Sequence, residues 1–159
     1  MIIGIMSDSH DNLDNIRKAV TLFNERGVSQ VLHAGDFVAP FTFRVLKDLN
    51  AAFTGIFGNN DGEVYFLNQM FQGRIFIQPH TINLEDKKLV MLHEHFLVDA
   101  LADSGHYDII VYGHTHKPVV EKKGKALVIN PGECGGWLYG KATVAVLDTV
   151  KMDAEIVEL

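Results

Sequence analysis

The chain has a single cysteine, Cys134, and no apolar run near the ~20 residues that span a bilayer. One cysteine cannot form an internal disulfide, which is typical of a protein in a reducing cytosol. The apolar run directly after Met1 lacks the preceding basic segment of a signal peptide. We therefore expect a cytoplasmic protein without a membrane partner.

Basic residues are too few for a broad nucleic-acid-binding surface. Lysine and arginine number 14 against 20 acidic residues, so the net charge is −6 at pH 7 and nucleic acid is not a favoured partner. The 159 residues are 47% hydrophobic and 21% charged, as in an ordinary globular protein, and they predict one domain over 1–159. Histidine is unusually frequent, with eight residues whose placement matters more than their number.

The first half of the chain alternates buried strands with amphipathic helices. The strands are predicted at 2–7, 31–36 and 51–58, and the helices at 13–26, 40–49 and 63–72. Asn12 or Asp11 caps the first helix, and Gly27 ends it. Pro40 opens the second helix. This alternation predicts a largely parallel sheet.

The second half is richer in strands. Two apolar runs flank the polar turn EDKK within 80–93, and a second hairpin turns at Lys123-Gly124 within 119–130. A helix at 97–103 precedes a buried strand at 108–113, and residues 141–159 supply a final strand pair. The two halves together predict two packed sheets flanked by helices.

Polar residues that can bind metal follow the predicted strands. They are Asp8, His10, Asp36, Asn59, His93, His114 and His116. In an open α/β sheet, sites form in the crevice beyond the carboxyl ends of the strands, so we expect these side chains to converge. The spacing of two in Asp8/His10 and His114/His116 directs both members of each pair to one side of an extended segment. His33, His80 and His106 are expected to be structural or exposed.

The size and chemistry of this set indicate two metal ions. A single zinc site uses about four ligands, whereas this set is larger and includes a carboxylate able to bridge two ions ~3.5–4 Å apart. Nitrogen and oxygen ligands without thiolate suit Mn, Ni, Fe, Zn or Co. Each motif alone, such as GNND at 58–61, reads as an ordinary turn, but their joint occurrence at strand ends favours a site.

The motifs occur in a fixed order: D-x-H at 8–10, G-D at 35–36, G-N-x-D at 58–61, a lone histidine after an apolar strand, and G-H-T-H at 113–116. In this combination the sequence resembles the calcineurin-like metallophosphoesterase superfamily, and in length and motif form its small YfcE-type phosphodiesterase branch. The resemblance implies an α/β fold in four layers, an αββα sandwich of two mixed β-sheets flanked by helices.

The resemblance also implies how two divalent metal ions share the ligands. The first ion would be held by Asp8, His10, Asp36 and His116, and the second by Asp36, Asn59, His93 and His114. Asp36 would bridge the two ions. Manganese stands first among the candidate metals.

The sequence departs from the family pattern near these ligands. Asn60 stands where many members have a histidine that protonates the leaving group, and loss of a positioned acid costs ~10²–10⁴-fold. This departure disfavours monoesters with poor leaving groups but not diesters. His95, two residues after His93, is a candidate proton donor and equally a candidate surface histidine. Glu94 replaces a glycine, and Glu133 replaces a serine and would repel an anionic substrate unless it points away.

The leading hypothesis is a binuclear metal-dependent phosphodiesterase in which a metal-bound hydroxide attacks a small phosphate ester. Its predicted catalytic residues are Asp36, Asn59 and His95. The alternatives are a non-catalytic partner-binding scaffold resembling the retromer subunit, and a metal-dependent phosphomonoesterase. A dimer or tetramer is a further hypothesis, which depends on whether these apolar residues are core or interface: Phe37, Phe41, Phe43, Phe66 and Trp137.

Overall fold

The first helix shows how the local sequence begins the fold. Helix α1 (Leu13–Glu25) follows Asn12, whose side chain accepts a hydrogen bond from the Asn15 backbone N–H at 3.3 Å. Its buried apolar face consists of Ile16, Ala19, Val20 and Phe23. Gly27 follows the helix in the left-handed region, at φ 62°. The predicted helix at 13–26 is confirmed.

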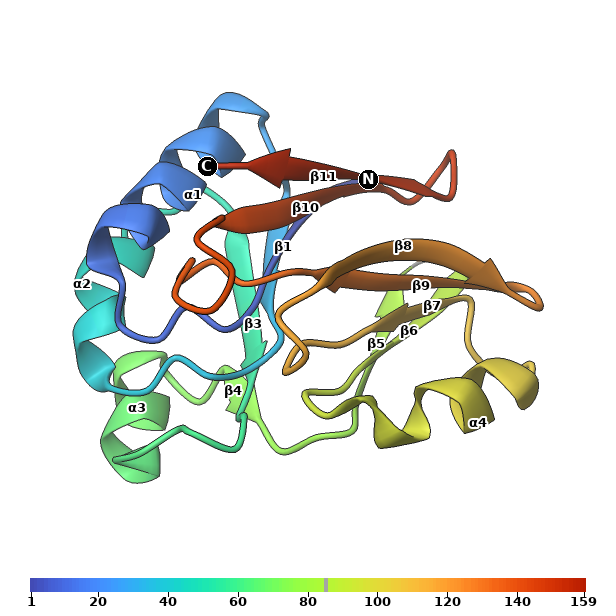
Figure 1. The fold of residues 1–159 in the computed structure, drawn as a ribbon, viewed down its shortest axis with the longest axis horizontal. Coiled ribbons are helices and arrows are strands. Elements are labelled where there is room, and N and C mark those ends of the chain that lie inside the picture. Colours follow the sequence, from blue (N-terminus) through green and yellow to red (C-terminus); the bar gives the residue numbers. More distant parts are fainter. Residues whose placement is uncertain (85) are drawn as a thin grey trace.

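The computed structural model of the protein describes residues 1–84 and 86–159, and its first sheet has six strands in the order β11-β10-β1-β2-β3-β4 (Figure 1). The strands are β1 (Ile2–Met6), β2 (Gln30–His33), β3 (Ala52–Ile56), β4 (Ile75–Phe76), β10 (Thr143–Asp148) and β11 (Asp153–Glu158). β1, β2 and β3 are parallel as predicted, β4 continues the parallel set, and β10 and β11 extend the sheet antiparallel beyond β1. β4 was not predicted, because two residues carry no periodicity.

The second sheet has five strands in the order β5-β6-β7-β9-β8. They are β5 (His80–Leu84), β6 (Lys87–Met91), β7 (Ile109–Val111), β8 (Pro118–Lys123) and β9 (Ala126–Pro131). Both predicted hairpins are confirmed as antiparallel pairs, β5 with β6 and β8 with β9. Residue 85 of the predicted EDKK turn lies outside the described residues. β6, β7 and β9 are parallel, so both sheets are mixed.

The remaining helices are short. They are the 3₁₀ turns η1 (Pro40–Thr42) and η2 (His95–Leu97) and the helices α2 (Phe43–Leu46), α3 (Val64–Met70) and α4 (Val98–Asp103). The helix predicted at 40–49 begins at Pro40 but is α-helical only over α2. Asp48 and Leu49 follow it with backbone hydrogen bonds to Val45 and Leu46, three residues back, so the turn after α2 is of the 3₁₀ type.

Three clusters of buried apolar residues separate four layers. One lies between α1, α2 and α3 and the first sheet, one between the two sheets, and one between the second sheet and α4 (Figure 1). The clusters include, in this order, Phe23 and Val31, Ile5 and Met91, and Val90 and Val98. The predicted αββα sandwich of two mixed sheets flanked by helices is confirmed.

The aromatic residues that the sequence could not assign to core or interface divide between the core and the surface. Phe37 is fully buried and stacks on the His33 ring at a centroid distance of 3.6 Å. Phe43 is partly buried against the cluster beneath α1, whereas Phe41, Phe66 and Trp137 are exposed. Exposure of these aromatic residues does not by itself define an interface, so the homo-oligomer remains a prediction. Over residues 1–84 and 86–159, no helix is long and apolar enough to cross a membrane.

Candidate metal centre

The predicted ligands lie in loops that follow the carboxyl ends of strands from both sheets. They follow β1 (Asp8 and His10), β2 (Asp36), β3 (Asn59), β6 (His93) and β7 (His114 and His116). Contacts join these loops across the two sheets: the His114 backbone N–H donates to the Asp8 carboxylate at 3.0 Å, and His93 Nδ1 donates to the Ala34 carbonyl at 2.8 Å. The sandwich thus gathers the predicted set at one edge.

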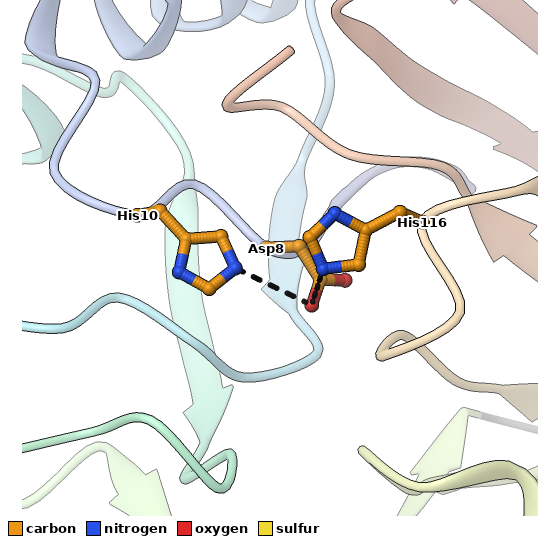
Figure 2. A group of neighbouring side chains, drawn as sticks. All are labelled: Asp8, His10 and His116. Carbon is orange, nitrogen blue, oxygen red and sulfur yellow. Dashed lines mark ion pairs between the residues drawn. The ribbon is translucent and has the colours of Figure 1, made fainter. Parts of the chain in front are cut away.

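The first group surrounds the buried carboxylate of Asp8. Figure 2 shows this carboxylate between two imidazole rings, with Oδ1 3.4 Å from His116 Nε2 and 4.0 Å from His10 Nε2. The rings of His10 and His116 stack at a centroid distance of 5.2 Å. One ligand atom from each of the three residues lies within 4.8 Å of the others, a spacing that one cation can occupy.

The second group meets at the side-chain oxygen of Asn59. Asn59 Oδ1 lies 2.9 Å from His93 Nε2 and 2.9 Å from His114 Nδ1. The other ring nitrogen of His93, Nδ1, faces the Ala34 carbonyl, which can only accept, so Nδ1 carries a proton. This contact directs Nε2 toward Asn59, as metal coordination requires.

Asp36 lies between the two groups. Its Oδ2 atom is 3.6 Å from His10 Nε2 and 3.4 Å from His93 Nε2. Asn60 donates two hydrogen bonds of 2.8 Å to the Asp36 carboxylate, one from its backbone N–H and one from its side-chain amide. From the sequence, Asn60 was expected only to lack the acid of the family histidine, and its role in holding Asp36 was not predicted.

Asp61 holds together the loops that carry Asp36 and Asn59. Its carboxylate accepts hydrogen bonds from the backbone N–H groups of Val38 at 2.7 Å, Gly58 at 2.7 Å and Asp36 at 3.1 Å. Asp61 therefore fixes backbone near the site without facing the candidate ligand atoms.

Many of the candidate ligands have an unusual backbone conformation. The φ angles are positive at Asp8 (50°), His10 (41°), Asp36 (61°), His114 (66°) and His116 (59°). Non-glycine residues rarely adopt this left-handed conformation, which costs ~1–3 kcal/mol each and occurs mainly at functional sites.

The electrostatics of the site fit divalent cations. Burial raises the pKa of Asp8, and the charge of Asp36 acts in the same direction. Burial also raises the pKa of Asp36, but hydrogen bonds from His93 and Asn60 outweigh it and hold the pKa well below its usual value. The Nε2 atom of His10 is buried and has no hydrogen-bond partner in the described part of the chain. A cation would offset the two carboxylate charges and bind this nitrogen.

Glu133 lies beside His116 and does not face into the site. Its side chain is buried, and Oε2 accepts a hydrogen bond of 2.9 Å from His116 Nδ1. Burial alone raises the pKa of Glu133, but hydrogen bonds from His116 and from the backbone N–H groups of Tyr139 and Leu138 lower it overall. The expected repulsion of an anionic substrate therefore does not apply, because the carboxylate points away.

The other histidines differ in position. His33 is buried, with Nε2 3.0 Å from Ser9 Oγ, and His106 is exposed beside Lys88. His80 is partly buried and stacks on Phe76. His95 is exposed but lies nearly parallel to the His114 ring, at a centroid distance of 6.1 Å. Its position beside a candidate ligand is compatible with proton donation, which remains a prediction.

Two motif glycines leave no room for a side chain beside the carboxylates. A Cβ at Gly58 would lie 2.2 Å from Asp36 Oδ1 and 2.5 Å from the Asp36 nitrogen. A Cβ at Gly113 would lie 2.0 Å from Ser7 Oγ and 2.8 Å from Asp8 Oδ2. The glycines of GNND and GHTH are thus explained by close packing against Asp36 and Asp8.

Gly58→Ala is expected to displace Asp36 and to weaken metal binding by ~10–100-fold, the usual cost of disturbing a ligand's support. Gly62→Ala in the same loop is the matched control, because the nearest described atom to its Cβ is the Val38 carbonyl oxygen at 3.7 Å, an ordinary contact. Titration of both variants with Mn²⁺ tests this expectation. Equal affinities in the two variants would contradict it.

The sequence is similar to that of known phosphoesterases. A family model described as "Calcineurin-like phosphoesterase superfamily domain" matches residues 1–152. Phosphodiesterase MJ0936 of Methanocaldococcus jannaschii is 42% identical over 159 residues, which cover 96% of this chain and 96% of that protein. Phosphodiesterase YfcE of Escherichia coli is 30% identical over 149 residues, covering 83% of this chain and 78% of that protein.

The fold is similar to the folds of two solved structures. The structure of a novel archaeal phosphodiesterase aligns with a TM-score of 0.92 at 41% identity and covers 100% of both chains. Vps29 of Chaetomium thermophilum aligns with a TM-score of 0.75 at 13% identity, covering 100% of this chain and 96% of that one. At this low identity, the likeness to Vps29 shows the fold alone.

Proposed function

Since the chain belongs to the calcineurin-like phosphoesterase superfamily, we propose that it is a binuclear metal-dependent phosphodiesterase acting on small phosphate diesters. The observation that carries the proposal is the position of Asp36, whose Oδ2 atom lies 3.6 Å from a histidine of one group and 3.4 Å from a histidine of the other. A carboxylate between two sets of nitrogen and oxygen donors suits a bridge between two cations. The similar proteins named phosphodiesterases support the same reaction.

The proposed sites share the candidate ligands as follows. Asp8, His10, Asp36 and His116 would hold one ion, and Asp36, Asn59, His93 and His114 would hold the other. When bound, such a pair of ions supplies an activated water near neutral pH and offsets charge on the phosphate oxygens. Manganese is the first candidate, since a mixed nitrogen and oxygen donor set without thiolate suits it.

The chain's own residues orient this chemistry. Asn60 fixes both oxygens of Asp36 through its two hydrogen bonds, so the bridging carboxylate keeps one orientation. Asn60 cannot protonate a leaving group, and His95, exposed beside His114, is the side chain proposed to do so. Because position 60 carries no acid and His95 is exposed at its place beside His114, we expect the enzyme to favour diesters and esters with good leaving groups.

Parallel assays of bis(p-nitrophenyl) phosphate and p-nitrophenyl phosphate test the substrate preference. With Mn²⁺, Ni²⁺, Zn²⁺ or Mg²⁺ added to separate samples, kcat/KM for the diester is expected to exceed that for the monoester, because the similar proteins are named phosphodiesterases. Both esters release the same p-nitrophenolate, so the comparison tests the type of ester and not the missing acid. Faster cleavage of the monoester would contradict the proposed diester preference. Failure to cleave either ester with any metal would favour the partner-binding scaffold.

The proposed location and the proposed size of the substrate follow from the composition of the chain. A single buried cysteine, Cys134, fits the reducing cytoplasm, where we propose that the enzyme acts. The proposed substrate is a small ester, because a net charge of −6 disfavours long polyanions.

A further inference from the structure

Glu133 is the second residue of the loop between β9 and β10, which is coloured orange to red in Figure 1. Its side chain is 1% exposed, and a buried carboxylate needs donors for its oxygen atoms. Besides His116 Nδ1, the donors are three successive backbone N–H groups: Trp137 at 2.9 Å, Leu138 at 2.9 Å and Tyr139 at 2.8 Å. One carboxylate thus joins a candidate metal ligand to the backbone of residues 137–139.

The hydrogen bond that His116 donates to Glu133 determines which nitrogen of the His116 ring carries the proton. A carboxylate facing amide N–H groups only accepts, so His116 Nδ1 carries the proton and Nε2 keeps its lone pair. Nε2 lies on the other side of the ring, 3.4 Å from Asp8 Oδ1. The ring therefore presents its metal-binding nitrogen toward the first group, as in carboxylate–histidine–metal arrangements.

The same loop contacts the other residues of the first group. The Trp137 indole Nε1–H donates to the His10 carbonyl at 3.3 Å, and the Gly135 N–H donates to the Asp8 carbonyl at 3.0 Å. The side chains of Trp137, Leu138 and Tyr139 are 64%, 65% and 54% exposed, so this part of the loop has little apolar packing to hold it. Hydrogen bonds to Glu133 and to the first group hold it instead.

We propose that Glu133 is a positioning residue of the first metal site, a role that rests on the proposed function. It sets the proton and direction of His116, and with the same oxygens it holds Trp137 beside His10. Metal binding at this site and the environment of Trp137 are therefore linked. Trp137 is the single tryptophan of the chain, so its fluorescence reports on this site.

Glu133→Gln tests the proposal with little change in side-chain volume, because the new amide nitrogen cannot accept hydrogen bonds. In the metal-depleted protein titrated with Mn²⁺, with free ion followed by electron paramagnetic resonance, wild type is expected to bind two equivalents. The variant is expected to lose ~10–100-fold in affinity at one equivalent and nothing at the other. The change in Trp137 fluorescence is expected to follow the weakened equivalent.

A double-mutant comparison identifies which site is affected. In His116→Ala, adding Glu133→Gln should cause no further loss of affinity, whereas in His93→Ala it should have its full effect, because of these two histidines it is His116 that contacts Glu133. Glu121→Gln on β8, an exposed glutamate paired with Lys123, is the matched control and should bind as wild type does. If Glu133→Gln fails to fold, Glu133→Asp, which keeps the charge, should show a smaller loss at the same equivalent.

The outcomes separate this inference from the proposed function. Wild-type affinity at both equivalents in Glu133→Gln, or equal losses at both, would overturn the positioning role while the diesterase stands. A wild-type protein that binds no Mn²⁺ would overturn the proposed function and with it the inference.

Discussion

Removal of divalent metal is expected to abolish hydrolysis of bis(p-nitrophenyl) phosphate by the protein, leaving only the uncatalysed rate measured in buffer alone. The bound ions lower the pKa of water from 15.7 to ~7, and without them the site has no comparable nucleophile. The one thiol cannot replace it, because burial raises the pKa of Cys134 to about 12. Dialysis against a chelator, followed by metal analysis and the diester assay, measures the loss.

Reconstitution provides the control for this prediction. Addition of Mn²⁺ to the depleted protein should restore the rate, and full recovery should need two equivalents, since the proposed chemistry uses both sites. The circular dichroism spectrum should show that the depleted protein stays folded. Full turnover without metal would contradict the proposed function, and recovery with a single equivalent would contradict its binuclear form.

Asp36→Asn is expected to lower kcat/KM for the diester by at least about 10³-fold, more than the loss of one ordinary electrostatic contact. Asparagine keeps the size of the side chain but removes the charge that lies between His10 and His93. Both metal sites are therefore weakened together. Steady-state kinetics and metal content measured on the same preparation test the expectation.

Two variants show whether the effect is specific to the bridge. Asp8→Asn should weaken the first site more than the second, because its carboxylate lies 3.4 Å from His116 Nε2 and 4.0 Å from His10 Nε2, whereas its contact with His114 of the second site is with the backbone N–H. Asp103→Asn, on the exposed surface of α4, should leave rate and metal content unchanged. An Asp36→Asn enzyme that keeps both metals and the wild-type rate would exclude the bridging role.

The sequence predicted two packed sheets flanked by helices because its long elements carry clear patterns, and the four-layer αββα sandwich came from the family resemblance. Strands such as β1 and β7 lie in short apolar runs, and α1 has a capping residue at one end and a glycine after the other. The convergence of the strand-end residues also followed from topology, since the carboxyl ends of parallel strands lie together. The two-residue β4 escaped prediction because it has too few residues to show a period, and the helix predicted at 40–49 is α-helical only over the four residues of α2.

The contacts that support the ligands were not predictable from local sequence. Glu133 reaches His116 across 17 positions, and Asn60 reaches Asp36 across 24 positions, so neither pair leaves a local signal. When only the sequence is known, a polar residue beside a ligand motif suggests a turn, a repulsive charge or a missing acid. Only the folded loops show that these side chains hold ligands in place.

The left-handed backbone at Asp8, His10, Asp36, His114 and His116 has an evolutionary consequence. Glycine adopts this conformation freely, so exchanging one of these residues for glycine relieves ~1–2 kcal/mol of backbone strain while deleting a candidate ligand. At Asp8 and Asp36 the exchange also leaves hydrogen-bond donors unpaired, whereas the Nε2 atom of His10 has no hydrogen-bond partner in the described part of the chain. In a descendant freed from the need to bind metal, we therefore expect His10 to be lost before the two aspartates, while the four layers persist.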